Sequence, residues 1–397
     1  MGWGEWPGKS PVVEGGPEHP AAYHMLDVAA VAERLIEPFG FSPALRDALV
    51  LLVALHDLGK ISDSFRAMLR EGVPQNWRHW ELSEILFYLH DEQLAAHIGG
   101  TPELRQVLYA SVAGHHGQPS GRGLGGLPLE TRGNRELFRA LRQVGSGQDP
   151  AGELIAAFCA LWPNASVDEL EPESERATAL GWWLPGLCAA ADWIGSNTDW
   201  FEPRPFAEPL ADYLVRVRER AEIAVTEAGL SGVKNLDDPL FDFTLRPMQA
   251  ACRDIELPAQ GPVLAIIEEE TGAGKTEAAL ILAQRMVNAG KGRGLYFALP
   301  TMATADAMFG RAAESVGGIF ANASLTLAHG RAALSEKFRN LIIKADNDRR
   351  DGDEPGCTEW LAESRRRALL ADVGVGTIDQ ALMAVSAVST HGTDLRL

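Results

Sequence analysis

The sequence predicts a chain of two domains, the first all-α and the second α/β. Its 397 residues exceed the usual size of a single hydrophobic core. From about residue 20 to residue 230, apolar residues recur at helical spacing, whereas after residue 242 short β-like runs alternate with helical ones. We therefore predict an all-α domain over residues 1–230, a linker over residues 231–242 and an α/β domain over residues 243–397.

Four segments of the first domain carry apolar residues three and four positions apart. They are residues 24–39 (HMLDVAAVAERLIEPF), 44–58 (ALRDALVLLVALHDL), 103–116 (ELRQVLYASVAGHH) and 182–195 (WWLPGLCAAADWIG). Because an α-helix completes a turn in 3.6 residues, this spacing places the apolar side chains on one face. Each segment is therefore expected to be a helix that packs into a core.

The second domain alternates strand-like and helical patterns. The apolar run PVLAII, residues 262–267, is followed by the helical pattern TEAALILAQRMVNAG, residues 276–290, and by the β-like run GLYFALP, residues 294–300. Such alternation is typical of parallel α/β units. We expect both apolar runs to be strands of a parallel sheet.

Composition and charge exclude several classes of protein. The apolar share is 46%, no apolar run is long enough to cross a bilayer, and the start MGWGEWPGKSP does not have the pattern of a secretory signal, so a soluble, cytoplasmic protein is expected. Four scattered cysteines without a C-x-x-C pair argue against disulfides and against a thiolate zinc site. A formal net charge of −18 means that any binding of nucleic acid depends on local sites.

Histidines and carboxylates at helix ends predict a metal centre in the first domain. His56 and Asp57 close the apolar run of residues 44–58, where burial requires partners such as a metal ion. The candidate ligands are His24, His56, Asp57, His79, His115, His116 and Asp192. Imidazole and carboxylate without thiolate suit Fe, Mn, Co or Ni. Two such ions, about 3.5–4 Å apart and sharing a carboxylate, would activate water and stabilise the entering and leaving oxygens of a phosphodiester.

Each candidate ligand alone also fits a structural role. A lone His24 is more often a hydrogen-bonded histidine, with Asp27 one turn on as its support. Only the whole set of residues favours a metal centre. His79 has a rival ligand nearby in His90. The histidines that we assign to structural roles are His19, His90, His97, His329 and His391.

A phosphate-binding loop is predicted at EETGAGKTEAA, which follows an apolar run and opens a helix. Gly272 and Gly274 allow backbone N–H groups to close around phosphate. Lys275 would reach the β- and γ-phosphates, and Thr276 would hold Mg²⁺. The usual pattern has a glycine where this chain has a glutamate five positions before Gly274, so a glycine-rich turn without a nucleotide is the alternative.

The motifs resemble, in order, those of one protein family. Four segments resemble the HD nuclease domain of the CRISPR-associated helicase-nuclease of type I systems: YHMLDVAAVAERL, ALHDLGKISDSF, AGHHGQP and ADWIGSNTDWF. Five more resemble the front half of its superfamily 2 helicase domain: FTLRPMQ, TGAGKTEAAL, ALPTMATADAMFGR, LAHGRA and VGTIDQALMA. This resemblance implies an all-α HD-type metal phosphohydrolase domain followed by an incomplete α/β RecA-like helicase lobe.

The same resemblance implies a function and partners. The chain would cut and unwind displaced single-stranded DNA after recruitment by the RNA-guided surveillance complex, Cascade. It would use two divalent transition metals, Ni, Co, Mn or Fe, and possible ligands of its helicase lobe are ATP and Mg²⁺. Two alternatives stay open. One is an HD phosphohydrolase that acts on nucleotides, and the other is a non-catalytic docking module for the surveillance complex.

The resemblance also implies roles for individual residues. One metal would be held by His24, His56, Asp57 and Asp192. The second would be held by Asp57, His79, His115 and His116, with Asp57 bridging. Asp57 and Lys60 would be catalytic, Lys60 through a phosphate contact, although a surface lysine after the helix-ending Gly59 fits equally well. The implied nucleotide-binding residues are Gln249, which would read adenine, with Thr271, Gly272, Gly274, Lys275 and Thr276. Thr301 and Thr304 would lie near the DNA backbone.

The family pattern continues past VGTIDQALMA to a DExH box, which this sequence does not contain. That box binds Mg²⁺ and positions the attacking water. The expectation is therefore that this polypeptide alone neither hydrolyses ATP productively nor unwinds DNA. The rest of the helicase would be a separate chain, or the sequence would be a fragment, natural or made.

Overall fold

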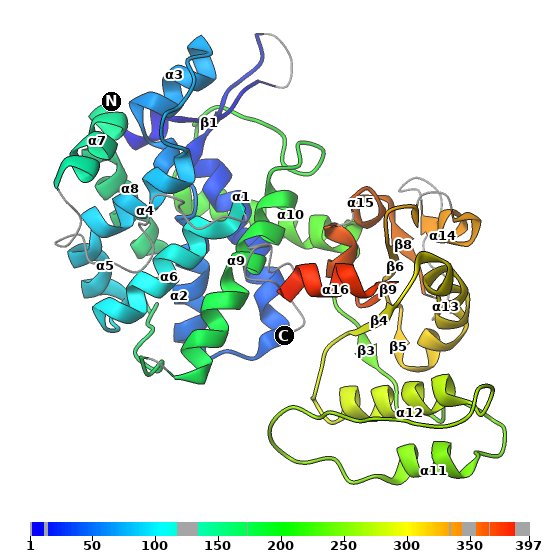
Figure 1. Ribbon diagram of the computed structural model, residues 1–397. Helices are drawn as coiled ribbons and strands as arrows, with labels where there is room; N and C mark the ends of the chain where they lie inside the picture. The colour runs from blue at the N-terminus through cyan, green and yellow to red at the C-terminus, as the bar shows by residue number, and fades with distance from the viewer. Residues whose placement is uncertain are drawn as a thin grey trace. The chain divides into compact units, whose positions relative to one another are not determined.

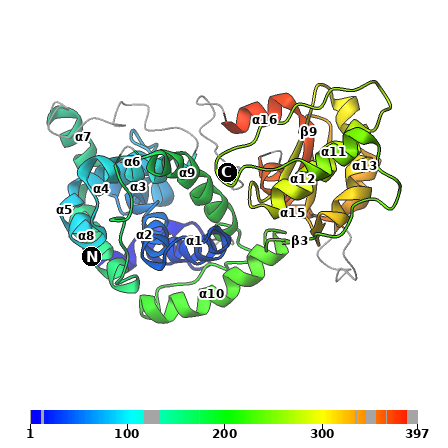
Figure 2. The same cartoon turned by 90° about the horizontal axis from the view of Figure 1, so that it is seen from below.

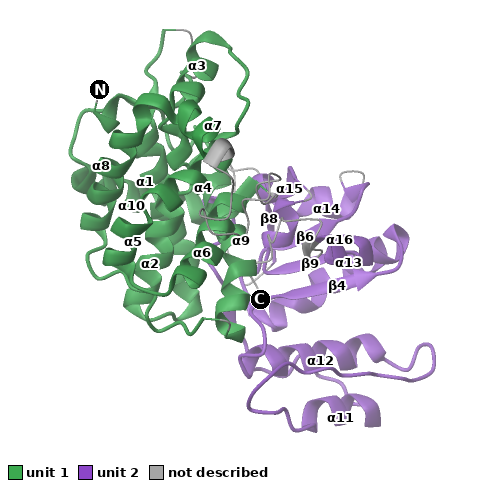
Figure 3. Cartoon of the chain, turned by 60° about the vertical axis from the view of Figure 1, so that its left-hand side comes forward, with its two compact units in different colours: residues 1–226, 385–393 green, residues 227–384, 394–397 purple. Residues whose placement is uncertain are grey.

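The computed structural model describes residues 2–11, 15–116, 134–172, 174–332, 335–343, 355–364 and 366–385. Figure 3 shows that the chain divides into two compact units. Among the described residues, unit 1 comprises the chain up to residue 226 together with Val385, and unit 2 comprises residues 227–384. The linker predicted over residues 231–242 therefore lies within unit 2, and the predicted domain boundaries stay a prediction.

Unit 1 is all-α apart from one short two-stranded ladder, as the sequence predicts (Figure 1). Its α-helices are α1 (Ala21–Ile36), α2 (Pro43–Ala54), α3 (Asp63–Glu71), α4 (His79–Leu89), α5 (Asp91–Ile98), α6 (Pro102–Ala113), α7 (Asn134–Val144), α8 (Gln148–Leu161), α9 (Glu175–Gly195) and α10 (Leu210–Glu227). Short 3-10 turns are η1 (Trp3–Glu5), η2 (Glu37–Phe39), η3 (Leu58–Lys60), η4 (Gly114–His116) and η6 (Gly145–Gly147). The antiparallel ladder joins β1 (Pro7–Lys9) to β2 (His19–Pro20).

Hydroxyl side chains fix where several of these helices begin. Ser42, Thr101 and Ser174 precede α2, α6 and α9, and each side-chain oxygen accepts a hydrogen bond from the backbone N–H three residues on. Such a cap contributes about 1 kcal/mol. Proline follows the cap in α2 and α6, where its missing N–H costs nothing. The sequence therefore determines the entry points of two helices that lead to the site described below.

Helix α1 is the centre of the unit 1 core. All of its residues except Glu33 and Arg34 are buried, and it packs against α2 and α9. The contact with α9 is close, because a Cβ atom at Gly195 would lie 2.9–3.0 Å from Val28. Helix α9 also packs against α6, and Figure 2 shows these helices from below. Polar side chains of α1 and α9 therefore meet inside the unit.

Unit 2 is built on a parallel sheet, which confirms the predicted α/β class. Strand β9 (Val373–Thr377) lies between β4 (Leu295–Leu299) and β6 (Leu325–Ala328), with Val373 opposite both Leu295 and Leu325. The helices are α11 (Pro247–Asp254), α12 (Lys275–Asn288), α13 (Met302–Ser315), α14 (Glu336–Leu341), α15 (Glu359–Ala362) and α16 (Ile378–Val385). Shorter elements are β3 (Lys234–Asn235), η7 (Val316–Gly318), β5 (Phe320–Ala321), β7 (Ile342–Ile343), β8 (Cys357–Thr358) and η9 (Arg367–Leu370).

One predicted strand is wrong. The run PVLAII, residues 262–267, belongs to no strand, and its Leu264 and Ile266 are 90% and 79% exposed. An apolar run becomes a central strand only when neighbouring strands pair with it and helices cover its faces. Within the described ranges no strand of unit 2 pairs with this run. The other two predicted elements, α12 and β4, are present.

All four cysteines are free and buried, as expected for reduced, packed thiols. None of the helices that the structure describes is both long and apolar enough to cross a lipid bilayer.

Candidate metal centre and nucleotide loop

The predicted metal ligands converge inside unit 1 although they come from five elements. His24 lies on α1, His56 and Asp57 lie in the turn between α2 and η3, and His79 is the first residue of α4. His115 and His116 lie on η4, and Asp192 lies in the last turn of α9. We call these seven residues the donor cluster. They fall into two sets, and the candidate ligand atoms of each set lie within 4.8 Å of one another.

The first set contains His24, His56, Asp57 and Asp192. His24 Nε2 lies 3.0 Å from Asp57 Oδ2 and 3.5 Å from Asp192 Oδ1. His56 Nε2 lies 3.2 Å and 3.8 Å from the same two oxygens. Two imidazole nitrogens and two carboxylate oxygens therefore face one point.

The second set contains Asp57, His79, His115 and His116. His79 Nε2 lies 3.0 Å from His116 Nε2 and 3.3 Å from Asp57 Oδ1, while His115 Nε2 lies 3.8 Å from that oxygen. His90, the rival of His79 in the sequence, lies at the C-terminal end of α4 and outside both sets.

Asp57 belongs to both sets and presents a different oxygen to each. Its Oδ2 faces His24 and His56, whereas its Oδ1 faces His79 and His115. A carboxylate in this orientation can bridge two cations, one on each oxygen. The geometry matches the bridging arrangement that the resemblance implies for Asp57, although the ligand roles stay a prediction.

Backbone carbonyls orient two of the imidazoles. His56 Nδ1 donates to Val53 O at 2.8 Å, and His115 Nδ1 donates to Val112 O at 2.7 Å, each from the residue three positions earlier. A ring that donates through Nδ1 leaves the lone pair of Nε2 for a cation. Both Nε2 atoms are also the atoms that face Asp57.

Buried atoms without hydrogen-bond partners test whether the donor cluster fits a cation. Within the described residues, His56 Nε2, Asp57 Oδ1 and His115 Nε2 are buried and make no hydrogen bond. Leaving such atoms unpaired is costly. Their convergence and their nitrogen and oxygen chemistry fit a divalent transition metal.

The two carboxylates of the donor cluster are held in their ionised form. Burial raises the pKa of Asp57, but Lys60, His56 and His79 outweigh it, and the pKa is well below its usual value. Burial likewise opposes ionisation of Asp192, but the neighbouring His56 outweighs it and lowers the pKa of Asp192 well below the usual value. Two anionic ligands are therefore present at neutral pH.

The imidazoles differ in protonation. Burial lowers the pKa of His24, and it lowers the pKa of both His79 and His115 to about 3, so these rings are neutral at pH 7. Burial also lowers the pKa of His56, but the negative charges of Asp57 and Asp192 outweigh it and raise this pKa to about 9. Without a metal, His56 therefore carries a proton that a cation has to displace.

Lys60 lies beside the donor cluster. Its Nζ is 2.6 Å from Asp57 Oδ2, and its side chain is almost wholly buried. The alternative prediction of a surface lysine at this position is therefore wrong. Lys60 therefore pairs with Asp57 inside the unit, and its contact with a phosphate stays a prediction.

Two features at this site were not predicted. Lys9 on β1 is half-buried, and its Nζ donates at 3.0 Å to the carbonyl of Gly195, the last residue of α9. Asp27, expected to support His24, instead pairs with His19 at 2.8 Å and accepts from the Tyr213 hydroxyl at 2.8 Å. Neither contact has a sequence signal, because the partners of Lys9 and of Tyr213 are both 186 residues away.

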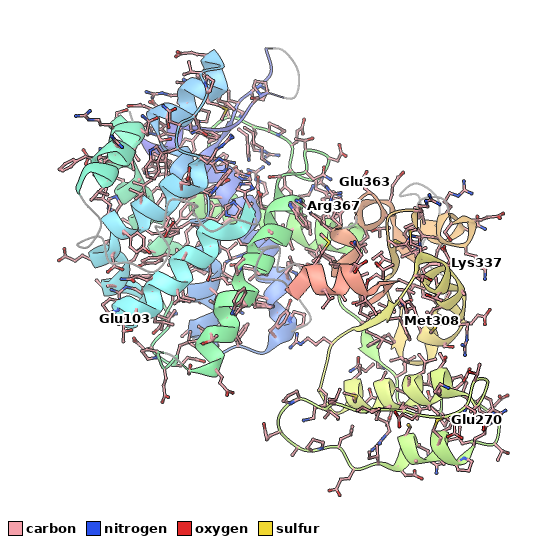
Figure 4. The ribbon with its side chains drawn as sticks, viewed as in Figure 1. Glu103, Glu270, Met308, Lys337, Glu363 and Arg367 are labelled. Atoms are coloured by element: carbon pink, nitrogen blue, oxygen red, sulfur yellow. The ribbon has the colours of Figure 1, made fainter. Side chains whose placement is uncertain are left out.

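The predicted nucleotide-binding residues lie together in unit 2. Gly272 and Gly274 adopt φ values of +83° and +91°, which only glycine takes without strain. Lys275 Nζ donates to the carbonyls of Glu269 and Glu270 at 2.5 and 2.8 Å, and Figure 4 labels Glu270 at the end of the extended segment before the loop. The lysine thus folds back over the loop.

Gln249 on α11 contacts the same loop. Its Nε2 donates to Gly274 O at 3.3 Å, and its Oε1 accepts from Arg246 N at 2.9 Å. Thr271 directly precedes Gly272 in the turn, and Thr276 Oγ1 accepts from Arg311 Nη1 at 3.1 Å. All six predicted residues therefore lie in this loop or beside it, and their role in binding a nucleotide stays a prediction.

Other predicted positions are also accounted for. Thr301 caps α13, and Thr304 completes its capping box. His19, His97 and His329 contact protein groups, namely Asp27, Trp162 O and Arg331 N. His391 lies outside the described residues.

Comparison with known proteins gives one family. Residues 6–201 match the family model described as "Cas3, HD domain". The CRISPR-associated endonuclease/helicase Cas3 of Thermus thermophilus is 30% identical over 95% of this chain and 43% of its own length. The protein of the same name from Escherichia coli is 27% identical over 96% of this chain and 47% of its own length. The chain thus spans less than half the length of these relatives.

Comparison of the fold with solved structures agrees with the sequence comparison. A crystal structure of T. fusca Cas3-AMPPNP matches 99% of this chain and 46% of that chain with a TM-score of 0.77 at 23% identity. That likeness covers both units and shows a shared fold.

Proposed function

The chain belongs to the family of Cas3 CRISPR-associated helicase-nucleases, and on this premise we propose that unit 1 is a metal-dependent nuclease that cuts single-stranded DNA. The observation that carries the proposal is Asp57, whose two carboxylate oxygens face two different sets of ligands. This arrangement is the one that two-metal hydrolysis of a phosphodiester requires. Ni, Co, Mn or Fe would suit the nitrogen and oxygen ligands.

The donor cluster and the residues next to it have separate roles in the proposed reaction. Two ions, when bound, would supply an activated water and charge stabilisation of the reacting oxygens. The carbonyls of Val53 and Val112 hold the rings of His56 and His115 with Nε2 toward the site. Lys60, which pairs with Asp57 in the absence of substrate, is placed to contact a phosphate oxygen.

The relatives' names support an assembly as well as an activity. A structure described as a CRISPR RNA-guided surveillance complex before nicking contains a chain of the same fold, with a TM-score of 0.63 at 21% identity. We therefore propose the RNA-guided surveillance complex as the partner that delivers the DNA, in the cytoplasm. Binding of the chain to an assembled complex, measured by mobility shift, tests this partner.

Unit 2 is proposed to bind ATP through the loop that Gly272, Gly274 and Lys275 form. Lys275 would leave the carbonyls of Glu269 and Glu270 for the phosphates, and Gln249 would contact the adenine. Equilibrium binding of a fluorescent ATP analogue tests this role. Lys275→Ala should abolish binding, whereas Lys291→Ala, in a loop away from these residues, should not change it.

Cleavage of circular single-stranded DNA tests the nuclease. The chain should cut it in Mn²⁺, Ni²⁺ or Co²⁺, and chelation should stop the reaction. Asp57→Asn keeps the size of the side chain but removes its charge, and it should reduce the rate at least about a thousandfold if both ions are lost. Asp212→Asn is the matched control, because Asp212 is exposed on α10.

The same assay separates the other functions. Cleavage of nucleotides by the wild-type chain without any cutting of DNA would replace the nuclease with a nucleotide phosphohydrolase. Unchanged DNA cleavage by Asp57→Asn would contradict the assignment of this site.

A further inference from the structure

Trp80 is a large aromatic side chain at the edge of the donor cluster. It is the second residue of α4 and directly follows His79. Its ring centroid lies 4.6 Å from that of His116 and 5.1 Å from that of His79. The side chain is partly exposed, whereas Trp77, three residues earlier, is only 3% exposed. The indole therefore reaches solvent beside two candidate ligands of the second set.

The charge of the chain makes an uncharged contact valuable there. A net charge of −18 repels a polyanion, so bulk electrostatics give single-stranded DNA little affinity. Stacking of a base on an aromatic ring does not depend on net charge and tolerates any sequence. Tryptophan offers the largest ring for such a contact.

Arg78, beside Trp80, is a second side chain that could contact the same nucleotide. Its side chain is exposed, and its guanidinium carbon lies 5.9 Å from the Trp80 ring centroid. That distance is the outer limit of a cation–π contact. An exposed arginine so loosely held can move aside and pair with the phosphate of a base that stacks on the indole.

We propose that Trp80 stacks on a base of single-stranded DNA and thereby positions the neighbouring phosphate at the donor cluster. This inference rests on the proposed function of unit 1 and adds a substrate-binding residue to it. The contact is with the base, so it distinguishes DNA from a bare sugar-phosphate chain.

Two substrates isolate the base contact. One is an oligothymidylate, and the other is an oligonucleotide of the same length whose residues are all abasic. The wild-type chain, Trp80→Ala, Trp80→Phe and the control Trp182→Ala are each assayed with both substrates in Mn²⁺, and the bound manganese of each protein is measured. Trp182 is a suitable control because it is 58% exposed, on α9 about 15 Å along the helix from Asp192.

The expected result is specific to the substrate with bases. Trp80→Ala should raise KM for oligothymidylate about tenfold, a loss equivalent to about 1.4 kcal/mol, while kcat changes little. Trp80→Phe should recover much of the affinity. Cleavage of the abasic substrate and manganese content should be the same in all four proteins.

Three results would overturn the proposal. Unchanged KM for oligothymidylate in Trp80→Ala would exclude stacking. An equal loss on both substrates, or a loss of manganese, would show that Trp80 only supports His79 and His116. If the wild-type chain cuts neither substrate, the proposed nuclease function fails first, and this outcome is visible without any variant.

Discussion

At the scale of single residues, Asp57 is the residue that the two ligand sets of unit 1 share. It is 2% exposed, it pairs with Lys60 at 2.6 Å, and it faces imidazoles on both of its oxygens. Removing it therefore affects both sets of ligands, whereas removing His56 affects one. This asymmetry leads to a prediction on metal content.

We predict that the wild-type chain binds about two Mn²⁺ ions, His56→Ala about one and Asp57→Asn fewer than one. Loss of a direct ligand should weaken the affected ion by more than the roughly 10–100-fold that loss of an orienting residue costs. Elemental analysis after equilibrium dialysis measures the stoichiometry. Asp212→Asn should bind as the wild type does, and equal losses in His56→Ala and Asp57→Asn would contradict a shared carboxylate.

A second prediction concerns protons. The pKa of His56 is raised to about 9 in the metal-free chain, so this ring is protonated at pH 7 and has to lose its proton when a cation binds. His79 and His115, with pKa values near 3, release none. Metal affinity should therefore rise with pH up to about 9, with about one proton released at pH 7.

Titration calorimetry in two buffers of different ionisation enthalpy counts the released protons. The same shift gives a sign for stability. Because the pKa of His56 in the folded chain exceeds its ordinary value of 6.5, its proton stabilises the metal-free chain fully below pH 6.5, and this contribution is lost as the pH rises through 9. A metal affinity that is independent of pH between 6 and 9 would contradict this account.

At the scale of elements, the turn η3 and the first turn of α4 determine where His79 lies. Gly59 N donates to Ser83 Oγ at 2.9 Å, and a Cβ atom on Gly59 would stand 1.9 Å from His79 O. No side chain other than hydrogen fits between the two elements. Backbone packing therefore positions a candidate ligand.

Gly59→Ala is accordingly predicted to push the start of α4 away from η3. Overpacking of this kind costs about 1–3 kcal/mol or more, and it should weaken the second ion more than the first. Thermal unfolding and manganese stoichiometry measure the two effects. Gly292→Ala is the control, because the nearest atom to an added Cβ there, Gly294 O, would lie at an ordinary contact distance of 3.8 Å; a similar loss there would show that the contact at Gly59 is not the cause.

Sequence patterns predicted some elements well and others not at all. The helices α1, α2, α6 and α9 of unit 1 follow from apolar spacing, and the polar pair His56–Asp57 stands out because it closes an apolar run. His79 carries a weaker signal, a histidine at the end of a predicted helix with His90 as a nearby rival, and the family resemblance assigns it to the second set. The run at residues 262–267 misleads, because an apolar run reports a need for burial and not the presence of a partner strand.

Contacts over long sequence distances account for the remaining differences. Lys9 meets the carbonyl of Gly195, and Tyr213 meets Asp27, each across 186 residues. No local periodicity encodes such a meeting, since it depends on how complete helices pack. For the same reason the sequence suggests His24, one helical turn away, as the partner of Asp27, and it does not indicate the contacts with His19 and Tyr213.

At the scale of the whole molecule, the chain consists of two units with separate cores. The donor cluster lies entirely in unit 1. We therefore predict two thermal transitions, of which Mn²⁺ raises only one. At a free ion concentration about 100 times Kd, each bound ion should raise that transition by about 5–10 °C.

Differential scanning calorimetry with and without Mn²⁺ measures this shift. Asp57→Asn should remove it, and Asp212→Asn should keep it. A shift of both transitions would show that the units unfold together.

Unit 2 exposes an apolar segment that costs solubility. Leu264 and Ile266 project into solvent from the unpaired run of residues 262–267, and an unpaired apolar segment of this kind promotes association between chains. The double variant Leu264→Ser with Ile266→Ser should lower aggregation several-fold. It should change the free energy of unfolding of the isolated chain by less than about 0.5 kcal/mol. Light scattering of the concentrated protein checks this prediction. The buried Leu282 is not changed in this variant.

The position of Asp57 between two ligand sets also has a consequence for how the chain would respond to metal supply. A two-metal reaction needs both cations at once, so a molecule that holds only one of them at Asp57 lacks one of the two charges that the reaction uses. Activity would then climb as roughly the square of a scarce ion's concentration, so that halving the supply would lower the rate about fourfold instead of about twofold.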